Sequence, residues 1–403
     1  MQSVVVAKPY KFVPPHRDAF WPTVLRPLRA RLLRSYGIAT VECRGVARLA
    51  ASVQAGHGIM LAPNHCRPGD PFAVATLGHA VGRHVHIMAS WHVFMQGRVQ
   101  RFLLPRVGAF SIYREGLDRE ALKCAGQIIA EARRPLVIFP EGIISRHNDR
   151  LNSLMEGTAL IARTAARQRA AARPAARVVI HPVAIRYLFE GDLRATVDPM
   201  LANLEQRLSW RPEGNRPPLE RIARIGAALL ALKEIEHLGA PQAGGIAERI
   251  RRLIDHLLCP LEDEWLKGRH EGDVVARVKL LRTALLPDLV AGQLSETENE
   301  RRWELIARLH LAQQLSCYPG NYLSASPSPE RILETVERFE EDLTDRVRQV
   351  APLRVVLDVG EAIEVNPERV RGGEDPLMKA IRTQLESMLQ ASLAERRPGA
   401  VWP

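Results

Sequence analysis

Residues 62–71 of the chain read Ala62-Pro63-Asn64-His65-Cys66-Arg67-Pro68-Gly69-Asp70-Pro71. The residues just before them, 58–61, form a short apolar run bounded by Gly and Pro, which predicts a buried strand. Residues 72–81 are mostly apolar, with small side chains, and predict a helix. His65 and Asp70 therefore fall on a strand-to-helix turn. In open α/β sheets such turns lie at the carboxyl edge, where ligands bind.

His65 and Asp70 are five residues apart on a tight turn, so their side chains can meet. An Asp in that position fixes the imidazole tautomer and stabilises the imidazolium, which makes His65 a general base for a hydroxyl or a water. The alternative is a structural histidine that is simply hydrogen-bonded in a turn. Three further segments bear on this choice.

The composition is that of a globular protein. The chain has 403 residues, 46% of them hydrophobic and 25% charged, which fits one large or two ordinary domains. No run of 18 apolar residues is present and the first residues do not resemble a signal peptide, so we expect a cytoplasmic protein. Five widely spaced cysteines argue against a disulfide framework and against a zinc site.

Positive charge is concentrated in the first half of the chain. Residues 1–190 contain 27 Lys and Arg against 11 Asp and Glu, whereas the remainder contains 29 against 34. A basic half indicates an anionic partner, such as phospholipid headgroups, an acidic substrate or nucleic acid. Aromatic residues make up only 5% of the chain and do not alternate with the basic ones, so we expect no nucleic-acid partner.

Residues 19–36 predict a basic amphipathic helix interrupted by Pro27. Its apolar positions recur every four residues, and its other positions carry arginines: Phe20, Val24, Leu28, Leu32; Arg26, Arg29, Arg31, Arg34. Such a segment can lie in the interface of an anionic membrane. It can equally be a surface helix that packs its apolar stripe on the core, and the sequence leaves both interpretations open.

The pattern along the chain predicts an α/β fold, a mostly parallel sheet flanked by helices, with a large all-helical insertion. Strands are expected at 59–63, 86–89, 136–140 and 178–187, and helices at 72–81, 91–104, 117–132 and 154–169. Only helices are expected next, at 219–238, 246–258, 274–285, 296–315 and 329–350, before a strand at 352–360 and a helix at 375–393. We therefore divide the chain into an N-terminal segment 1–37, an α/β domain 38–195, a helical insertion or accessory region 196–350, and a return to the α/β domain at 351–403.

Three more segments carry polar residues at expected strand ends. Gly108 begins a short apolar run that ends at Arg114, whose planar guanidinium suits a phosphate or carboxylate. Phe139-Pro140-Glu141-Gly142 follows an expected strand, and Pro182 interrupts another. Each has a plain alternative, namely a surface arginine, a strand end or an edge-strand proline.

Together the four segments resemble the glycerolipid acyltransferase family, which includes glycerol-phosphate and lysophospholipid acyltransferases. Asn64, His65 and Asp70 match the family's Asn-His-x4-Asp motif, and Gly108 and Arg114 match its Gly-x-x-Phe-x-x-Arg motif in spacing. Residues 139–142 match its Phe-Pro-Glu-Gly motif, and Pro182 matches its proline-containing strand. The late strand with Gly360-Glu361-Ala362-Ile363 is also similar to the end of this domain, whereas residues 200–350 resemble no family.

The resemblance implies transfer of an acyl group from a thioester of coenzyme A or acyl carrier protein to a hydroxyl. His65 would act as the base and Asp70 would orient it, with no covalent intermediate, no cofactor and no metal. The substrate-binding residues that it implies are Asn64, Gly108, Arg114, Glu141, Gly142 and Pro182.

The chain departs from the family pattern in three places. Ser111 stands at the Phe position of the second motif, Ile143 and Ile144 stand where Thr-Arg usually follows the third, and Glu156 stands at a position that is commonly basic. Arg146 can replace one of the missing phosphate contacts.

The expected partners are the inner face of an anionic membrane and a lysolipid or glycerol-phosphate acceptor. Acyl carrier protein is a further partner if it carries the donor acyl group. Two other functions stay open. One is a metal-assisted hydrolase, which would use the histidine-rich span 57–92; the other is a non-catalytic lipid-binding scaffold of the same fold.

Overall fold

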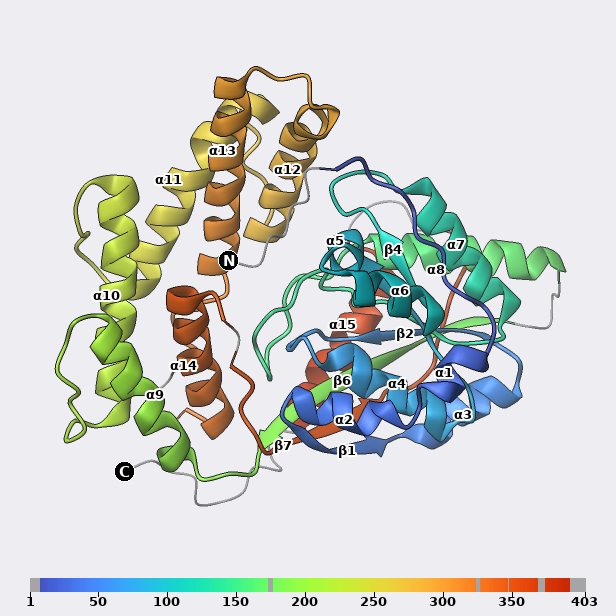
Figure 1. The fold of residues 1–403 in the computed structure, drawn as a ribbon. Helices are drawn as coiled ribbons and strands as arrows, with labels where there is room; N and C mark the ends of the chain where they lie inside the picture. Colours follow the sequence, from blue (N-terminus) through green and yellow to red (C-terminus); the bar gives the residue numbers. More distant parts are fainter. Residues whose placement is uncertain (1–7, 173–176, 324–326, 347, 369–373, 392–403) are drawn as a thin grey trace.

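The computed structural model describes all residues except 1–7, 173–176, 324–326, 347, 369–373 and 392–403 (Figure 1). Within these residues the centre is an eight-stranded mixed sheet in the order β1-β7-β6-β2-β5-β3-β4, with the short β8 paired to β6. The strands are β1 (Ile38–Arg44), β2 (Gly58–Pro63), β3 (His86–Ser90), β4 (Ala109–Ile112), β5 (Leu136–Val137), β6 (Val178–Phe189), β7 (Leu353–Val359) and β8 (Ile363–Glu364). The predicted fold class is confirmed.

Five neighbouring strands run in one direction. β2 is parallel to β5 and β6, and β3 is parallel to β4 and β5. Their carboxyl ends therefore meet at one edge of the sheet, which Figure 1 shows facing the helical part of the molecule. β7 is antiparallel to β6 and parallel to β1.

Helices cover both faces of the sheet, and each face has its own apolar core. On one face pack α2 (Leu28–Ser35), α3 (Val46–Gln54) and α4 (Asp70–Ala80). On the other pack α7 (Arg119–Glu131), α8 (Gly157–Ala172) and α15 (Pro376–Ala391). Every residue of β2 is buried between these layers, as expected for a central strand with an apolar run.

Between β6 and β7 the described chain is helical, and it forms a separate body beside the sheet (Figure 1). Its helices are α9 (Leu193–Arg207), α10 (Pro218–Leu238), α11 (Ile246–Leu266), α12 (Val274–Ala291), α13 (Glu296–Leu315) and α14 (Pro329–Thr344). We call residues 193–344 the helical region. α10 to α13 share one apolar core, and α9, α10 and α14 share a second.

Several elements differ from the sequence prediction: β1, α3 and α9 were not expected, α12 ends later and α14 earlier than expected, and three others differ as follows. The expected helix 91–104 is two helices, α5 (Trp91–Met95) and α6 (Arg98–Arg106), because the backbone is extended at Gly97. β5 ends at Val137 instead of residue 140, although the N–H of Ile138 still donates to the carbonyl of Leu61 at 3.0 Å. α11 continues to Leu266, past Pro260, because Leu257, Leu258 and Leu261 extend its buried stripe.

The N-terminal segment forms two short helices, α1 (Phe20–Val24) and α2, separated around Pro27 as expected. Among the helices that the structure describes, none is both long and apolar enough to cross a membrane.

Candidate active site

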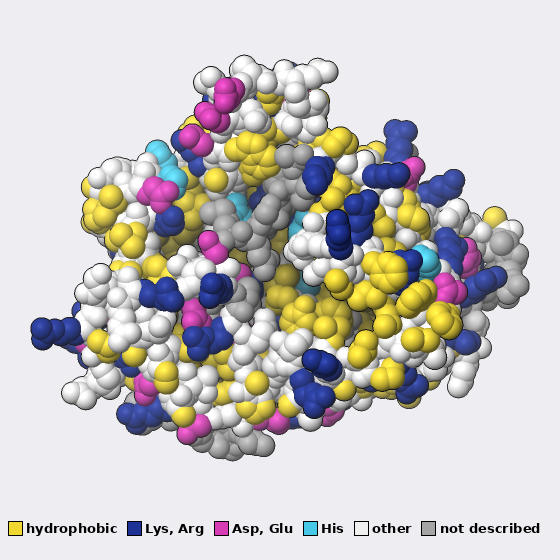
Figure 2. Space-filling view, in the orientation of Figure 1, with side chains coloured by type: hydrophobic (Ala, Val, Ile, Leu, Met, Phe, Trp, Pro, Cys, Tyr) yellow, Lys and Arg dark blue, Asp and Glu magenta, His cyan; other side chains and the backbone are white. Residues whose placement is uncertain are grey.

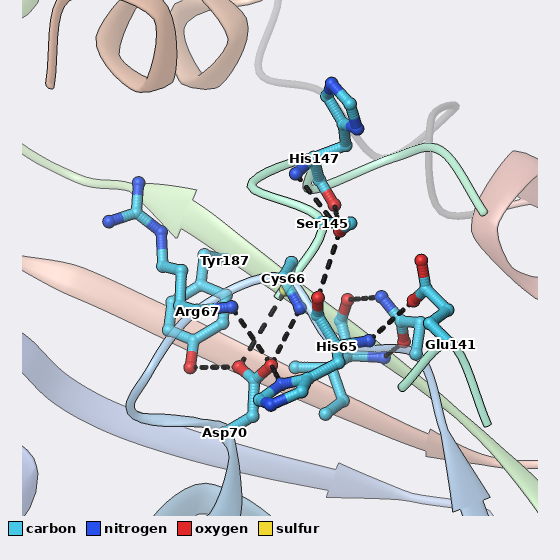
Figure 3. Close-up of polar contacts among 10 residues, drawn as sticks. His65, Cys66, Arg67, Asp70, Glu141, Ser145, His147 and Tyr187 are labelled. Carbon is cyan, nitrogen blue, oxygen red and sulfur yellow. Dashed lines mark hydrogen bonds and ion pairs between the residues drawn. The ribbon is translucent and has the colours of Figure 1, made fainter. Parts of the chain in front are cut away.

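His65 lies on the turn between β2 and α4, at the carboxyl edge of the sheet (Figure 3). Its Nδ1 is 2.8 Å from Oδ2 of Asp70, the first residue of α4. A buried carboxylate accepts hydrogen bonds, so Nδ1 carries the proton and Nε2 is left with its lone pair. The side chain of His65 is 15% exposed and that of Asp70 is fully buried. The predicted contact between the two side chains is present, and Nε2 bonds to no other described residue.

Asp70 is held by more groups than the sequence indicates (Figure 3). Its Oδ2 also accepts from the backbone N–H groups of Cys66 and Arg67, at 2.8 and 3.0 Å. Its Oδ1 accepts from the hydroxyl of Tyr187 at 2.6 Å. Burial and the Asp70 carboxylate raise the pKa of the Tyr187 phenol well above its usual value, so the phenol stays a donor. Tyr187 belongs to β6, 117 residues away, and the sequence analysis missed it.

Glu141 is placed differently from the expectation. It is 1% exposed, and both its carboxylate oxygens are occupied by the backbone. Oε1 accepts from the N–H of His65 at 2.7 Å, and Oε2 accepts from the N–H of Asn152 at 3.1 Å. Burial raises the pKa of Glu141 to about 7. Glu141 therefore fixes the backbone of His65 rather than reaching a substrate headgroup.

The loop after Gly142 also hydrogen-bonds to the backbone of His65. The N–H and hydroxyl of Ser145 both donate to the carbonyl of His65, at 2.7 and 3.0 Å (Figure 3). The ring of Phe139 stacks on the imidazole with centroids 4.1 Å apart. These contacts fix both the backbone and the ring plane of His65. Ser145 was not among the predicted site residues.

Arg114 and Gly142 come together, as their positions at strand ends predict. Nη1 of Arg114 donates to the carbonyl of Gly142 at 2.8 Å. Gly142 has φ +68°, in the left-handed region that favours glycine, and a Cβ there would meet Sδ of Met155. Arg114 is thus tied to the same loop that holds His65.

Gly108 and Asn64, two of the predicted binding residues, have structural contacts in the fold. Gly108 precedes β4, so it lies at the amino end of that strand, away from His65. It has φ +96°, and a Cβ there would lie 2.5 Å from Arg134. Asn64 is completely buried and clamps β2 to β6 through Ile185, accepting its N–H at 2.7 Å and donating to its carbonyl at 3.1 Å.

Pro182 and Arg146 also differ from the expectation. Pro182 is buried in the interior strand β6, not at an edge, in the gap where the neighbour of β6 changes from β8 to β7. The missing N–H of proline interrupts neither ladder there. Arg146 pairs with Glu341 on α14, with 2.6 Å between Nη2 and Oε1. Its guanidinium is therefore engaged by the helical region.

The histidine-rich span does not gather into a metal site. His84 bonds to Thr23 and His86 bonds to the carbonyl of Gly108. In the part of the chain that the structure describes, the one group with metal-ligand spacing is Cys259, Glu262 and His270, in the helical region. The carboxylate of Glu262 accepts hydrogen bonds from Nε and Nη2 of Arg277, at 2.7 and 2.8 Å. Its charge is therefore already neutralised by a cation.

Part of the chain matches a known protein family. The family model described as Acyltransferase matches residues 41–186, a span that runs from β1 into β6 and includes every predicted site residue. No curated protein matches the chain. The matched span carries the His65–Asp70 pair at the carboxyl edge of a mostly parallel sheet. Residues 41–186 therefore form an acyltransferase domain of the glycerolipid acyltransferase family.

Proposed function

We propose that the protein transfers a fatty acyl group from an acyl thioester, on coenzyme A or acyl carrier protein, to a hydroxyl of a lysophospholipid or glycerol-phosphate-type acceptor. The observation that carries this proposal is the 2.8 Å contact between His65 Nδ1 and Asp70 Oδ2, within a domain that matches the acyltransferase model. That contact leaves Nε2 as a base beside the carboxyl edge of the sheet.

The reaction follows from this tautomer. Nε2 of His65 accepts the proton of the acceptor hydroxyl as its oxygen attacks the thioester carbonyl. Asp70 stabilises the imidazolium that forms, in the role that a triad aspartate plays beside its histidine. The tetrahedral intermediate then expels the thiolate, and Nε2–H returns the proton to the sulfur. One ester bond forms and one thioester bond breaks.

No enzyme nucleophile is required, and the two nearest nucleophilic side chains are poorly suited to be one. Cys66 is 1% exposed, and burial together with Asp70 raises the pKa of its thiol well above the usual value, so the reactive thiolate is disfavoured. The hydroxyl of Ser145 is fully buried and donates to the His65 carbonyl. We therefore propose direct transfer, without a covalent acyl-enzyme.

A membrane surface is the proposed source of the acceptor. We define the apolar ridge as the exposed hydrophobic side chains of α1, α2 and α6: Phe20, Val24, Leu28, Leu32, Val99 and Phe102. Trp21 joins the two parts, since its ring centroid lies 5.9 Å from that of Phe102. Exposed arginines flank the ridge: Arg31, Arg34, Arg98 and Arg101.

An apolar ridge bordered by arginines suits the interface of an anionic bilayer. Figure 2 shows hydrophobic side chains gathered over α1 and α6, on the same face as the hollow between the sheet and the helical region. We propose peripheral association with the inner face of the membrane through this ridge.

The test is release of free thiol from palmitoyl-coenzyme A, and from palmitoyl acyl carrier protein, with a panel of lysolipid and glycerol-phosphate acceptors. We expect release that depends on one class of acceptor and is lost in His65→Ala, but kept in His256→Ala, which changes an exposed histidine of α11. Release without any acceptor would favour a hydrolase. No release with either donor would favour the scaffold function.

A further inference from the structure

Arg282, on α12 of the helical region, is a buried cation without a partner. Its side chain is 5% exposed, and its Nε and Nη2 have no hydrogen-bond acceptor among the described residues. A buried guanidinium that lacks both a counter-charge and hydrogen bonds is strongly unfavourable. Elsewhere in the helical region the buried arginines Arg221 and Arg277 are paired with carboxylates. Arg282 is therefore exceptional within its own surroundings.

Basic groups of three other elements lie within electrostatic range of Arg282. Nε of Arg114, after β4, is buried without an acceptor, as are both ring nitrogens of His310 on α13. His92, on α5, bonds to Ser90 through Nδ1 at 2.7 Å. The nearby acid is Glu115, and no ion pair joins it to Arg114 or Arg282 in the described structure. We call Arg114, Arg282, His92 and His310 the cationic cluster.

The members of the cationic cluster act on one another's ionisation. Burial, and then the charge of Arg114, lowers the pKa of Arg282 to about 10. Burial and the same two arginines lower the pKa of His92 to about 3, and burial with Arg282 lowers that of His310 to about 4. At neutral pH the cluster thus has two charged guanidinium groups and two uncharged imidazoles. Two like charges in a buried position are stabilised by an anion between them.

The cationic cluster adjoins the His65 site. Arg114 donates to the carbonyl of Gly142, and the preceding residue, Glu141, holds the N–H of His65. Ser153, in the same loop, hydrogen-bonds to Asp273 at the start of α12. Figure 2 shows histidine and Lys or Arg side chains around the hollow between the helical region and the sheet. The helical region thus contacts, through Asp273, the loop that holds His65, and Arg282 follows on the same helix.

We infer that Arg282 of the helical region and Arg114 of the acyltransferase domain together bind a phosphate group of the substrate. Arginine forks match phosphate oxygens in geometry and charge, and the imidazole N–H groups of His92 and His310 add neutral donors. The inference rests on the proposed function for the identity of the substrate. It also gives the helical region a role in binding, which no feature of its sequence indicates.

Two phosphates have this chemistry, the headgroup phosphate of the acceptor and a phosphate of coenzyme A. The first experiment measures binding without turnover, by calorimetry with sn-glycerol 3-phosphate and with coenzyme A. We expect one of the two compounds to bind the full chain. Its affinity should be about tenfold or more weaker for Arg282→Met, and intermediate for Arg282→Lys. The control is Arg251→Gln, an exposed arginine of α11, which should bind as the unmodified chain does.

Stability supplies a second readout, which turnover does not affect. Removal of an uncompensated buried charge should raise the unfolding temperature of Arg282→Met in phosphate-free buffer, whereas added ligand should stabilise only chains that keep the cation. If neither compound binds the unmodified chain, or if Arg282→Met binds as tightly as it does, the inference is wrong. This outcome is independent of whether the chain transfers acyl groups.

Kinetic preferences then identify the source of the phosphate. If the acceptor phosphate is bound, Arg282→Met lowers the preference for lysophosphatidate over monoacylglycerol about tenfold or more in kcat/KM. If the donor phosphate is bound, Arg282→Met instead lowers the preference for acyl-coenzyme A over acyl-pantetheine. An active enzyme in which neither preference changes would overturn the inference while leaving the proposed function standing.

Discussion

Arg67 donates both terminal nitrogens of its guanidinium to Glu337, with 2.8 Å between Nη2 and Oε2 and 3.3 Å between Nη1 and Oε1. Arg67 is two residues beyond His65, and Glu337 lies on α14 of the helical region. The guanidinium also lies over the ring of Tyr187, 5.4 Å from its centroid. The helical region is therefore tied to the turn that carries His65, the proposed base, and its docking supports the geometry of His65.

Glu337→Gln tests this tie. The pair is 12% and 10% exposed, so loss of the carboxylate leaves Arg67 poorly compensated and should lower the free energy of unfolding by about 3 kcal/mol. We also expect kcat to fall, because Arg67 shares the turn of His65. The matched control is Glu234→Gln, which breaks the comparably buried pair with Arg249 inside the helical region. It should lose similar stability in denaturant titrations and keep its kcat; equal losses of kcat in both variants would argue against the tie.

Asp70→Asn should abolish most turnover. An amide at this position no longer enforces the Nδ1–H tautomer of His65, so Nε2 ceases to be the base. We expect kcat to fall by about 10³–10⁴-fold with little change in KM, as measured by steady-state acyl transfer.

Tyr187→Phe separates support of Asp70 from the chemistry itself. It removes one donor to a buried carboxylate and should lower the free energy of unfolding by about 1–3 kcal/mol. Its kcat should fall much less than that of Asp70→Asn, because the Asp70–His65 contact is retained. A loss in Tyr187→Phe as large as in Asp70→Asn would mean that Asp70 does not act through His65 alone.

Glu141 predicts a pH dependence of stability. Its folded-state pKa is about 7, above the ordinary value of 4.5, so the folded chain binds the extra proton between these two values. The stabilisation is fully present below pH 4.5 and is lost as the pH rises to about 7, by up to roughly 3 kcal/mol.

Glu141→Gln, compared with the unmodified chain, isolates this contribution. The amide cannot accept both backbone N–H groups, so the variant is less stable at low pH and its kcat falls through misplacement of His65. The difference in unfolding free energy between the two chains should shrink from pH 4.5 to 7 and stay constant above. A difference that is the same at every pH would show that Glu141 titrates normally.

The apolar ridge predicts membrane binding that depends on hydrophobic contact and on charge. The double substitution of Phe20→Ser and Val24→Ser removes two side chains that are 63% and 51% exposed. It should weaken sedimentation with anionic vesicles by about tenfold or more, and added salt should weaken binding of the unmodified chain. Leu232→Ser, at a side chain of α10 that is 51% exposed, is the control and should bind normally. Equal binding by all three chains would contradict the assignment of this surface.

The sequence predicts the part of the site that depends on local spacing. His65 and Asp70 share one turn, so five residues and a strand-to-helix transition are enough to place them in contact. Arg114 and Gly142 were expected at one edge because parallel strands end there, and their 2.8 Å contact agrees. The strand expected at 352–360 is present as β7.

Contacts between side chains and residues far away in the sequence could not be predicted from the sequence. A glutamate at a strand end looks the same whether it meets a headgroup or the backbone N–H of a residue 76 positions earlier, as Glu141 does. For Tyr187 the sequence contains one indication, because a tyrosine in an apolar strand needs a hydrogen-bond partner for its hydroxyl. Arg282 had none, because it is one of 56 Lys and Arg and only the packing of α12 leaves it unpaired.

The most direct test of the central claim follows the acyl chain itself. Labelled palmitoyl thioester is incubated with the full chain and a phosphate-bearing acceptor, and the products are identified by mass spectrometry beside those of His65→Ala. We expect the label in an ester of the acceptor and none in that ester when His65 is replaced. Label found as free fatty acid, or ester formed equally well by His65→Ala, would contradict acyl transfer with His65 as its base.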